Sequence, residues 1–143
     1  LIALCALVFS VTAHAESESN STVLIELTGL ESAEGNLFIA VYNSKKTWLG
    51  EETVAEKQVV ITESREGDIV KAELELPPGE YALSIFHDTN DNGELDANFI
   101  GIPKEPVALS NNARPKFGPP KYKDAVFELG AEPVLQQISM EEI

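Results

Sequence analysis

Cysteine, histidine and basic residues are scarce in this sequence, and each shortage excludes a class of protein. One of the 143 residues is Cys and two are His. Cys5 and His14 lie in the apolar N-terminal stretch, so the rest of the chain has no thiol and only His87 as an imidazole. Because protein zinc sites are built mainly from Cys and His ligands, we expect no zinc site. We also expect no disulfide, so the hydrophobic core must stabilise the fold.

Basic residues are outnumbered by acidic ones. Ten Lys and Arg stand against 24 Asp and Glu, which gives a formal net charge of −14. Binding to nucleic acid and to anionic membrane surfaces depends on Lys and Arg, so we expect neither as a partner. An acidic surface suits divalent cations, and it also keeps a protein soluble without binding anything.

Long apolar runs are absent except at the N-terminus. Leu1–Ala15 contains no Asp, Glu, Lys or Arg, and its apolar run of about 11 residues is too short for a membrane span of about 20. Ala13-His14-Ala15 has the small-residue pattern of a signal-peptidase site. We therefore predict that residues 1–15 are a signal peptide that lacks its own N-terminus. Residues 16–143 would form one exported domain, in the periplasm or outside the cell, without membrane insertion after cleavage.

Apolar and polar residues alternate through much of the remaining chain, which predicts β-strands. The clearest alternation is in Ile69–Leu76, whereas Leu37–Tyr42 is apolar on both faces, as expected for a strand covered on two sides. No segment has convincing helical periodicity. We therefore predict an all-β fold, an antiparallel β-sandwich of about seven strands with one long irregular loop. The predicted strands are residues 23–28, 37–42, 54–62, 69–76, 81–87, 125–129 and 134–138.

One aromatic residue in a connection has two interpretations. Trp48 lies beside Leu49 in the middle of Lys45–Thr53, between two predicted strands. An aromatic side chain there can stack on a ligand, or it can close the open end of the sandwich. Because aromatic residues dominate cores, we expect the second role.

The longest segment without periodicity is Phe86–Asp124, which is rich in Asn, Asp, Gly and Pro. Irregular segments longer than about 12–15 residues are usually functional or disordered. This one opens with DTNDNGELD, in which Asp or Asn recurs at alternate positions and Gly93 is sixth. Calcium-binding loops have this spacing, because Ca²⁺ takes several oxygen ligands and the Gly allows a sharp turn. The predicted calcium ligands are Asp88, Asn90, Asn92, the backbone carbonyl of Glu94, and Asp96.

Two features depart from the EF-hand pattern. Phe99 occupies position twelve, where a bidentate Glu is expected, and the flanking residues do not have helical patterns. Glu105 or backbone carbonyls near Asn98 would have to complete the site, with an affinity on the order of 10⁻⁴–10⁻³ M. The alternative is a loop without metal, because Asp and Asn cap their own backbone and tolerate left-handed conformations.

The residues from His87 to Leu129 resemble a family signature. It runs H-D-x-N-x-N-G-x-L-D-x-N-x-x-G-x-P-x-E, followed by S-N-N-A, G-P-P and an aromatic-x-D-A-x-F. The family is an uncharacterised bacterial secreted one, catalogued as domain of unknown function twenty-one forty-one. The matching residues are His87–Asp96, Asn98, Gly101, Pro103, Glu105, Ser110–Ala113, Gly118–Pro120, Tyr122, Asp124, Ala125 and Phe127.

A second, shorter resemblance supports the fold. Leu76–Leu83, LPPGEYAL, is similar to the strand–turn–strand of transthyretin-like and carboxypeptidase regulatory-like sandwiches. Together the resemblances imply an immunoglobulin-like or transthyretin-like sandwich in the periplasm or outside the cell, and they imply no known activity. The chain departs from the family pattern at Pro106–Leu109, where a Gly-aromatic-Gly-Phe-like run is more usual.

Rigid scaffolds commonly present binding residues on loops. We therefore predict a binding or structural module whose long loop is ordered by Ca²⁺ and contacts a protein or a small-molecule ligand. Asn side chains both donate and accept hydrogen bonds, so those in the loop are also expected to satisfy its backbone groups. The candidate contact residues are His87, Asn98, Glu105, Asn111, Asn112 and Arg114.

Two alternatives stay open. A hydrolase-like enzyme could use His87 and Asp88 as base and carboxylate, with the Ser110 hydroxyl nearby, but the chain has no nucleophile-elbow motif. We name no catalytic residue, because His87 is expected to end a strand and hydrogen-bond a loop carbonyl. The other alternative is a protein-interaction module that binds no metal.

Overall fold

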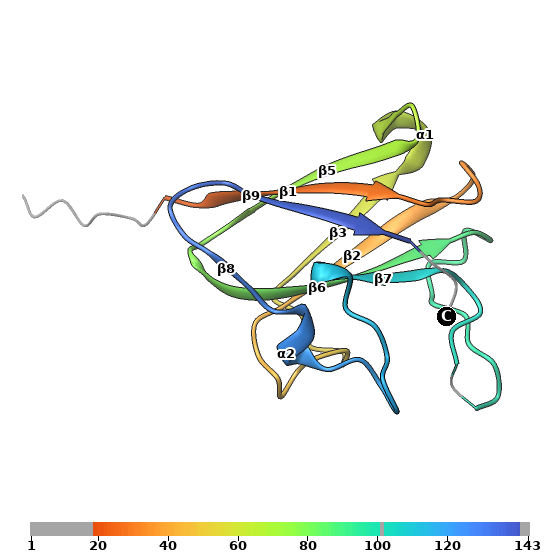
Figure 1. Ribbon diagram of the computed structural model, residues 1–143. Coiled ribbons are helices and arrows are strands. Elements are labelled where there is room, and N and C mark those ends of the chain that lie inside the picture. Colours follow the sequence, from red (N-terminus) through yellow and green to blue (C-terminus); the bar gives the residue numbers. More distant parts are fainter. Residues whose placement is uncertain (1–18, 101, 141–143) are drawn as a thin grey trace, which may run out of the picture.

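Nine β-strands and three short helical turns form the described part of this computed structural model, residues 19–100 and 102–140. They pack as two β-layers (Figure 1), so the predicted all-β sandwich is confirmed. The predicted signal peptide lies outside the described residues. The elements are β1 (Ser21–Thr28), β2 (Asn36–Tyr42), β3 (Ala55–Val60), α1 (Ile61–Ser64), β4 (Arg65–Glu66), β5 (Ile69–Leu76), β6 (Gly79–Asp88), β7 (Val107–Leu109), the 3₁₀ turn η1 (Ser110–Asn112), α2 (Tyr122–Ala125), β8 (Phe127–Leu129) and β9 (Val134–Ser139).

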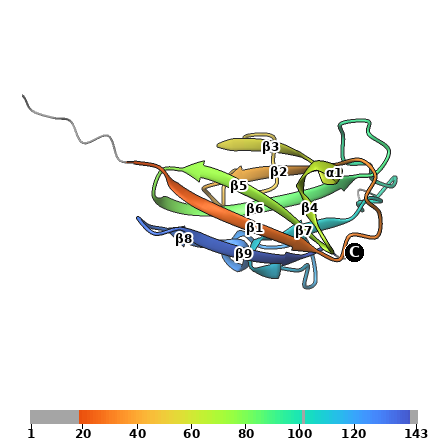
Figure 2. The ribbon, with the colours of Figure 1, turned by 90° about the horizontal axis from the view of Figure 1, so that it is seen from above.

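The two sheets have different strand orders. The first sheet has the order β4-β5-β1-β9, and the second has the order β3-β2-β6-β7, with β8 also pairing with β6. Paired strands of the described chain run antiparallel except β1 and β9, which are parallel. Figure 2 shows the strands of both layers running in similar directions, as in an aligned sandwich. None of the helices in residues 19–100 and 102–140 is long and apolar enough to cross a membrane.

Strand alternation places apolar side chains of both sheets between the layers. In β1, Val23, Ile25 and Leu27 are buried. Leu37 and Ile39 of β2 join them in the same core cluster. Burial of a side chain of this size contributes about 1.5–3 kcal/mol. Residues 19–100 and 102–140 contain no Cys, so the packing of this core is a main contribution to their stability.

Several element boundaries differ from those predicted. The strand predicted to reach residue 62 ends at Val60, where the chain turns into α1 and buries Ile61 completely. Ala125 lies in α2 instead of in a strand. The two additional strands, β4 and β7, have two and three residues. Strands that short do not by themselves produce a recognisable alternation, and β8, also of three residues, was predicted only because Ala125 before it extends the pattern.

Three connections lie beyond the second sheet, on the side away from the core. They are the 43–54 loop between β2 and β3, the 89–106 loop between β6 and β7, and the 113–121 loop between η1 and α2. Figure 1 shows all three extending below the β2–β6 layer. The outer face of this sheet is consequently enclosed by loops, and it carries the candidate site.

Candidate functional site

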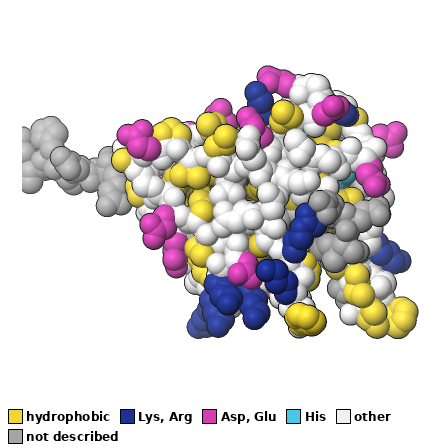
Figure 3. All heavy atoms as spheres, in the orientation of Figure 1, with side chains coloured by type: hydrophobic (Ala, Val, Ile, Leu, Met, Phe, Trp, Pro, Cys, Tyr) yellow, Lys and Arg dark blue, Asp and Glu magenta, His cyan; other side chains and the backbone are white. Residues whose placement is uncertain are grey.

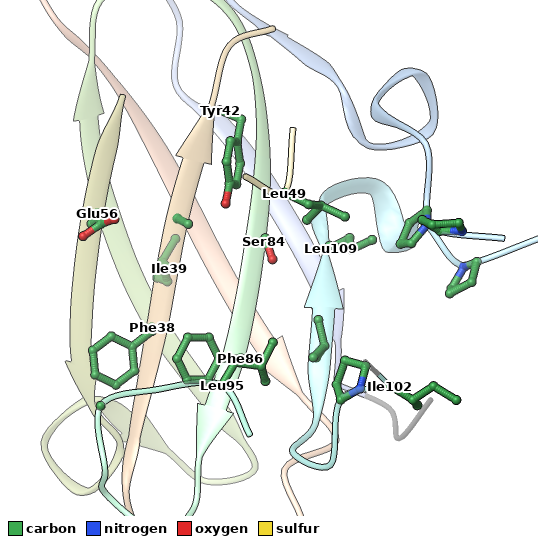
Figure 4. A pocket seen from close by; sticks show the side chains of 17 residues that line it. Phe38, Ile39, Tyr42, Leu49, Glu56, Ser84, Phe86, Leu95, Ile102 and Leu109 are labelled. Carbon is green, nitrogen blue, oxygen red and sulfur yellow. The ribbon is translucent and has the colours of Figure 1, made fainter. Parts of the chain in front are cut away.

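An apolar trough with a volume of about 690 Å³ lies on the outer face of the second sheet. Its floor consists of outward-facing side chains of β2 and β6 (Figure 4). Phe38 and Phe86 are partners in the register of these strands, and their rings are nearly parallel, with centroids 5.0 Å apart and planes at 11°. Ala40 and Ser84, also partners in the register, continue the floor.

Side chains from the three loops form the walls of the trough. Leu49, Leu95 and Ile102 are 41%, 41% and 44% exposed, so these apolar walls face solvent. Pro115 and Pro119 add a wall whose backbone is stiffened by the proline rings. The trough is lined by Phe38, Ile39, Ala40, Tyr42, Leu49, Glu56, Ser84, Phe86, Gly93, Leu95, Ile102, Pro103, Val107, Leu109, Pro115, Pro119 and Pro120.

Few polar groups line the trough. The Tyr42 hydroxyl donates a hydrogen bond to the carbonyl oxygen of Gly50 at 3.1 Å. Burial raises the pKa of the Tyr42 phenol above its ordinary value, and the negative charge of Glu56 adds to the shift. Glu56 and Ser84 are the other polar side chains in the lining. The trough thus offers mainly apolar contact, with a few groups that could orient a ligand.

Trp48 connects two of the walls. Its indole Nε1 donates to the carbonyl oxygen of Pro120 at 3.0 Å. Its ring also meets the rings of Tyr42 and Tyr122 edge-on, with centroids 5.2 Å and 5.9 Å apart. Trp48 therefore belongs to a small cluster with Ala82 outside the main core. The expectation that it closes the open end of the sandwich is wrong, because its loop folds under the sheet.

Residues 88–96, here called the Asx loop, are closed by their own hydrogen bonds. Asp88 is fully buried, and its carboxylate accepts the backbone N–H groups of Asn92 at 3.2 Å and Gly93 at 2.8 Å. The Asp96 carboxylate accepts the side-chain amides of Asn92, at 2.9 and 3.1 Å, and of Asn90. These hydrogen bonds, led by those from Asn92, hold the pKa of Asp96 below its ordinary value.

The predicted calcium ligands fit the ion in chemistry, because carboxylate and amide oxygens are what Ca²⁺ prefers. In the observed conformation of the Asx loop, those oxygens accept hydrogen bonds from N–H groups. Asn90 Oδ1 accepts the N–H of Asn92, and Asn92 Oδ1 accepts the N–H of Glu94. Within residues 19–100 and 102–140, no three His, Cys, Asp or Glu side chains are grouped to hold a metal. Ion binding would require both Asn amides to turn away from Asp96.

Glu105 joins the two ends of the Asx loop. It is 7% exposed, and its Oε2 accepts the Thr89 N–H at 2.8 Å while its Oε1 accepts the Asp96 N–H at 3.0 Å. Glu105 was predicted as a surface contact or as a replacement ligand for position twelve. The structure instead places it beneath the loop as a brace, where a partner cannot reach it.

His87 is 1% exposed and points to the core side of β6. Its Nε2 lies 2.6 Å from the carbonyl oxygen of Glu34, the loop-carbonyl contact that was expected. Ser110 is also fully buried, and its hydroxyl donates to the Ala125 carbonyl and accepts the Leu83 N–H. Neither side chain is available as a base or nucleophile in this arrangement, and His87 is not part of an accessible surface.

The remaining candidate residues are exposed or partly exposed. Asn98 Oδ1 accepts the N–H groups of Ile100 and Ile102, both at 3.0 Å. Asn111 and Asn112 adopt left-handed backbone conformations, and their side-chain amides bond to the backbone of Val126 and of strand β9, respectively. The prediction that these Asn side chains satisfy loop backbone groups is therefore confirmed for Asn98, whereas the Asn112 side chain bonds the backbone of strand β9. Arg114 is exposed beside them on the 113–121 loop.

The trough itself was not predicted from the sequence. Its one signal was the apolar run Leu37–Tyr42, which predicts cover on both faces of β2. The cover on the outer face proves to be three loops that leave a gap. Leu49, Leu95 and the prolines of the 113–121 loop come from segments without periodicity, so their convergence could not be inferred.

The family model of DUF2141, described as an uncharacterised protein conserved in bacteria, matches residues 25–137. This range includes every strand except the first residues of β1 and the last of β9. No curated protein and no solved structure matches the chain.

Proposed function

This chain belongs to the DUF2141 family, whose description names no activity, and we propose from its geometry that it is a binding module for a small, predominantly apolar molecule held in the trough. The observation that carries this proposal is the trough's concave apolar surface. Its volume of about 690 Å³ falls within the range of about 300–1,000 Å³ typical of small-molecule sites. The chain would act in the periplasm or outside the cell, given the signal-peptide pattern in residues 1–15.

The shape of the trough favours a small molecule over a protein surface. Side chains of three loops line it together with its floor, and a concave apolar surface of this kind is typical of small-molecule sites. The walls are also fixed in place, by the Trp48–Pro120 hydrogen bond on one side and by the Glu105 brace on the other. A preformed site of this kind loses little conformational entropy on binding.

Calcium binding at the Asx loop is a second candidate, and it concerns the same site. Gly93 and Leu95 belong to the Asx loop and line the trough. The supporting observation is the buried Asp88 carboxylate beside a loop in which Asp91, Glu94 and Asp96 add three more. Two ion pairs join described residues, Arg65 with Asp68 and Lys71 with Glu66, and neither involves this loop. An ion would offset the mutual repulsion and hold this wall of the trough.

The trough can be tested with 8-anilinonaphthalene-1-sulfonate, a fluorescent molecule with an apolar body. At ~0.3 kcal/mol per non-hydrogen atom, a ligand of about 20 such atoms should bind with a Kd on the order of 10⁻⁵–10⁻⁴ M. Ala40→Phe places a ring on the floor and should weaken binding at least about tenfold. Thr22→Phe adds the same ring to the other sheet, at a residue that lies outside the trough lining, and should leave the Kd unchanged.

Equal affinities for the two variants would contradict the proposal, as would the absence of saturable binding to the unmodified protein. Unfolding midpoints of both variants serve as the control for folding, because this dye also binds partly folded states. A variant whose midpoint falls well below that of the parent is replaced by the smaller change Ala40→Leu.

A further inference from the structure

The cations of this acidic protein are concentrated in one short segment. Residues 114–123, RPKFGPPKYK, contain four of the ten Lys and Arg and no Asp or Glu, in a chain with a net charge of −14. All four side chains are exposed. Together with Pro119 and Asp124 they line a shallow hollow of about 150 Å³. The four are Arg114, Lys116, Lys121 and Lys123.

An aromatic side chain stands among these cations. Phe117 is fully exposed at 112%, between Lys116 and Gly118, and its φ of 53° is unusual for a bulky residue. Single exposed apolar residues are common on soluble proteins. A fully exposed Phe in a strained backbone conformation, directly after a lysine and within a segment of four cations, is a more specific feature. We call residues 113–121 with Lys123 the basic loop.

The basic loop is held at both ends, so its side chains are presented from a fixed base. At its start, Asn112 Oδ1 accepts the Ser139 N–H at 2.8 Å and its amide donates to the Gln137 carbonyl. At its end, the Pro120 carbonyl accepts the Trp48 indole N–H, and Tyr122 is 8% exposed in the cluster beneath. Three prolines between these anchors restrict the backbone further.

A second apolar tip extends on the same side of the molecule. Phe99 is fully exposed and Ile100 is 65% exposed, both in the 89–106 loop. Figure 1 shows this loop and the basic loop projecting below the second sheet. In Figure 3 the Lys and Arg side chains gather on this lower part of the visible face, whereas Asp and Glu are more frequent above and to the left.

We propose that the basic loop docks on the surface of an anionic phospholipid bilayer, with its cations at the headgroup phosphates and the Phe117 ring in the interface. Cations beside exposed aromatic and aliphatic side chains are the combination that favours a lipid interface. The net charge of the whole chain does not oppose this. At physiological salt, charges act over about 8 Å, so the attraction to the membrane is set by the charges on the surface that faces it.

This proposal rests on residues other than those that form the floor of the trough. Membrane docking and ligand binding in the trough can therefore be disproved independently of each other. Vesicle sedimentation provides the test, with phosphatidylcholine containing about 30% phosphatidylglycerol compared against pure phosphatidylcholine. The protein should bind the anionic vesicles, bind the neutral ones much more weakly, and dissociate when NaCl rises from about 0.05 to about 0.5 M.

Two variants test the contributions of charge and ring. Lys116→Gln/Lys121→Gln should weaken vesicle binding at least about tenfold, because each lysine near an anionic surface contributes severalfold. Lys57→Gln/Lys71→Gln removes the same charge from a hollow lined by Glu63, Glu66 and Glu73, and should leave binding unchanged. Phe117→Ser should weaken binding severalfold without changing its dependence on salt.

The proposal is overturned if the protein fails to bind anionic vesicles, or if both lysine pairs weaken binding equally. It is also overturned if Phe117→Ser has no effect, since the contact would then be nonspecific charge attraction. All the basic-loop substitutions are at exposed positions, and an unfolding midpoint equal to that of the parent shows that each variant is folded.

Discussion

At the scale of single residues, the acidic side chains near the trough accept hydrogen bonds from different donors according to their burial. Asp88 and Glu105 are buried and hold the backbone of the Asx loop through N–H groups. Asp96 is more exposed, and its carboxylate accepts hydrogen bonds from the side-chain amides of Asn90 and Asn92. The sequence pattern assigns the Asp88 and Asp96 carboxylates to one ion, because spacing alone does not distinguish a carboxylate that faces N–H groups from one that faces a metal.

The first prediction concerns Glu105. Glu105→Ala removes the acceptor of two backbone N–H groups, those of Thr89 and Asp96. Leaving such groups unsatisfied costs about 1–3 kcal/mol each, so the unfolding free energy should fall by a few kcal/mol in urea denaturation. Glu94→Ala removes the same charge from an exposed position in the Asx loop. This control should change the unfolding free energy by less than about 0.5 kcal/mol. Equal losses would show that Glu105 is not a brace.

The second prediction concerns the pH dependence of the Asx loop. Hydrogen bonds from Asn92 and Asn90 lower the pKa of Asp96 in the folded state. The Asp96 carboxylate therefore contributes fully to the stability of the folded state at pH values above 3.8, the ordinary pKa of Asp. That contribution is lost as the pH falls through the lower pKa of the folded state. NMR titration of the Asp96 carboxyl should report a low pKa that rises in Asn92→Ala. A pKa that does not move in this variant would contradict the hydrogen-bond assignment.

At the scale of elements, the long alternating strands could be predicted and the short pieces could not. The period of two in Ile69–Leu76 reappears as alternating burial along β5. The segment 86–124 has no period, yet it contains β7, η1 and α2. Its order comes from contacts distant in sequence, such as the Ser110 hydroxyl bonded to Leu83 and Ala125, which no local pattern encodes.

The third prediction concerns the attachment of η1 to β9. The Asn111 N–H donates to Gln136 Oε1 at 2.9 Å, its amide donates to the Val126 carbonyl at 2.8 Å, and its φ is 58°. Asn111→Ala loses the amide bonds and puts a less tolerant residue in a left-handed conformation, so the protein should lose about 1–3 kcal/mol. Asn111→Gly should lose less, because glycine accepts that backbone. Equal losses would mean that backbone conformation contributes little.

At the scale of the whole molecule, the sandwich is a scaffold whose second sheet carries both proposed contacts. The fold class and family follow from alternation and from the motif in residues 87–129. The trough does not, since it depends on which loops meet beneath the sheet. The four cations of the basic loop are visible in the sequence, but the contacts that hold its two ends are not. Net charge was misleading in one respect, because a total of −14 conceals a segment with four cations.

The fourth prediction concerns calcium. An ion that binds only the folded protein raises its stability by about 1.4 kcal/mol at ten times the Kd, which is a shift of several degrees in Tm. Thermal unfolding in millimolar Ca²⁺ against excess EDTA should show this shift in the parent and in Asp91→Asn, and lose it in Asp96→Asn. Asp91 is the matched control because its carboxylate accepts the Asn36 amide and is outside the predicted ligand set. An identical Tm with and without Ca²⁺ would contradict calcium binding, and the Asx loop would then be stabilised by its own hydrogen bonds alone.

The central claim is that the trough is the binding site, and NMR mapping of the dye tests it most directly. Backbone amide shifts recorded during titration with 8-anilinonaphthalene-1-sulfonate should change around Ala40, Ser84 and Leu95, and their fitted Kd should agree with the fluorescence value. Residues on the outer face of the first sheet, such as Thr22 and Glu73, should keep their shifts. Changes centred on those residues, or spread over both sheets, would contradict the account.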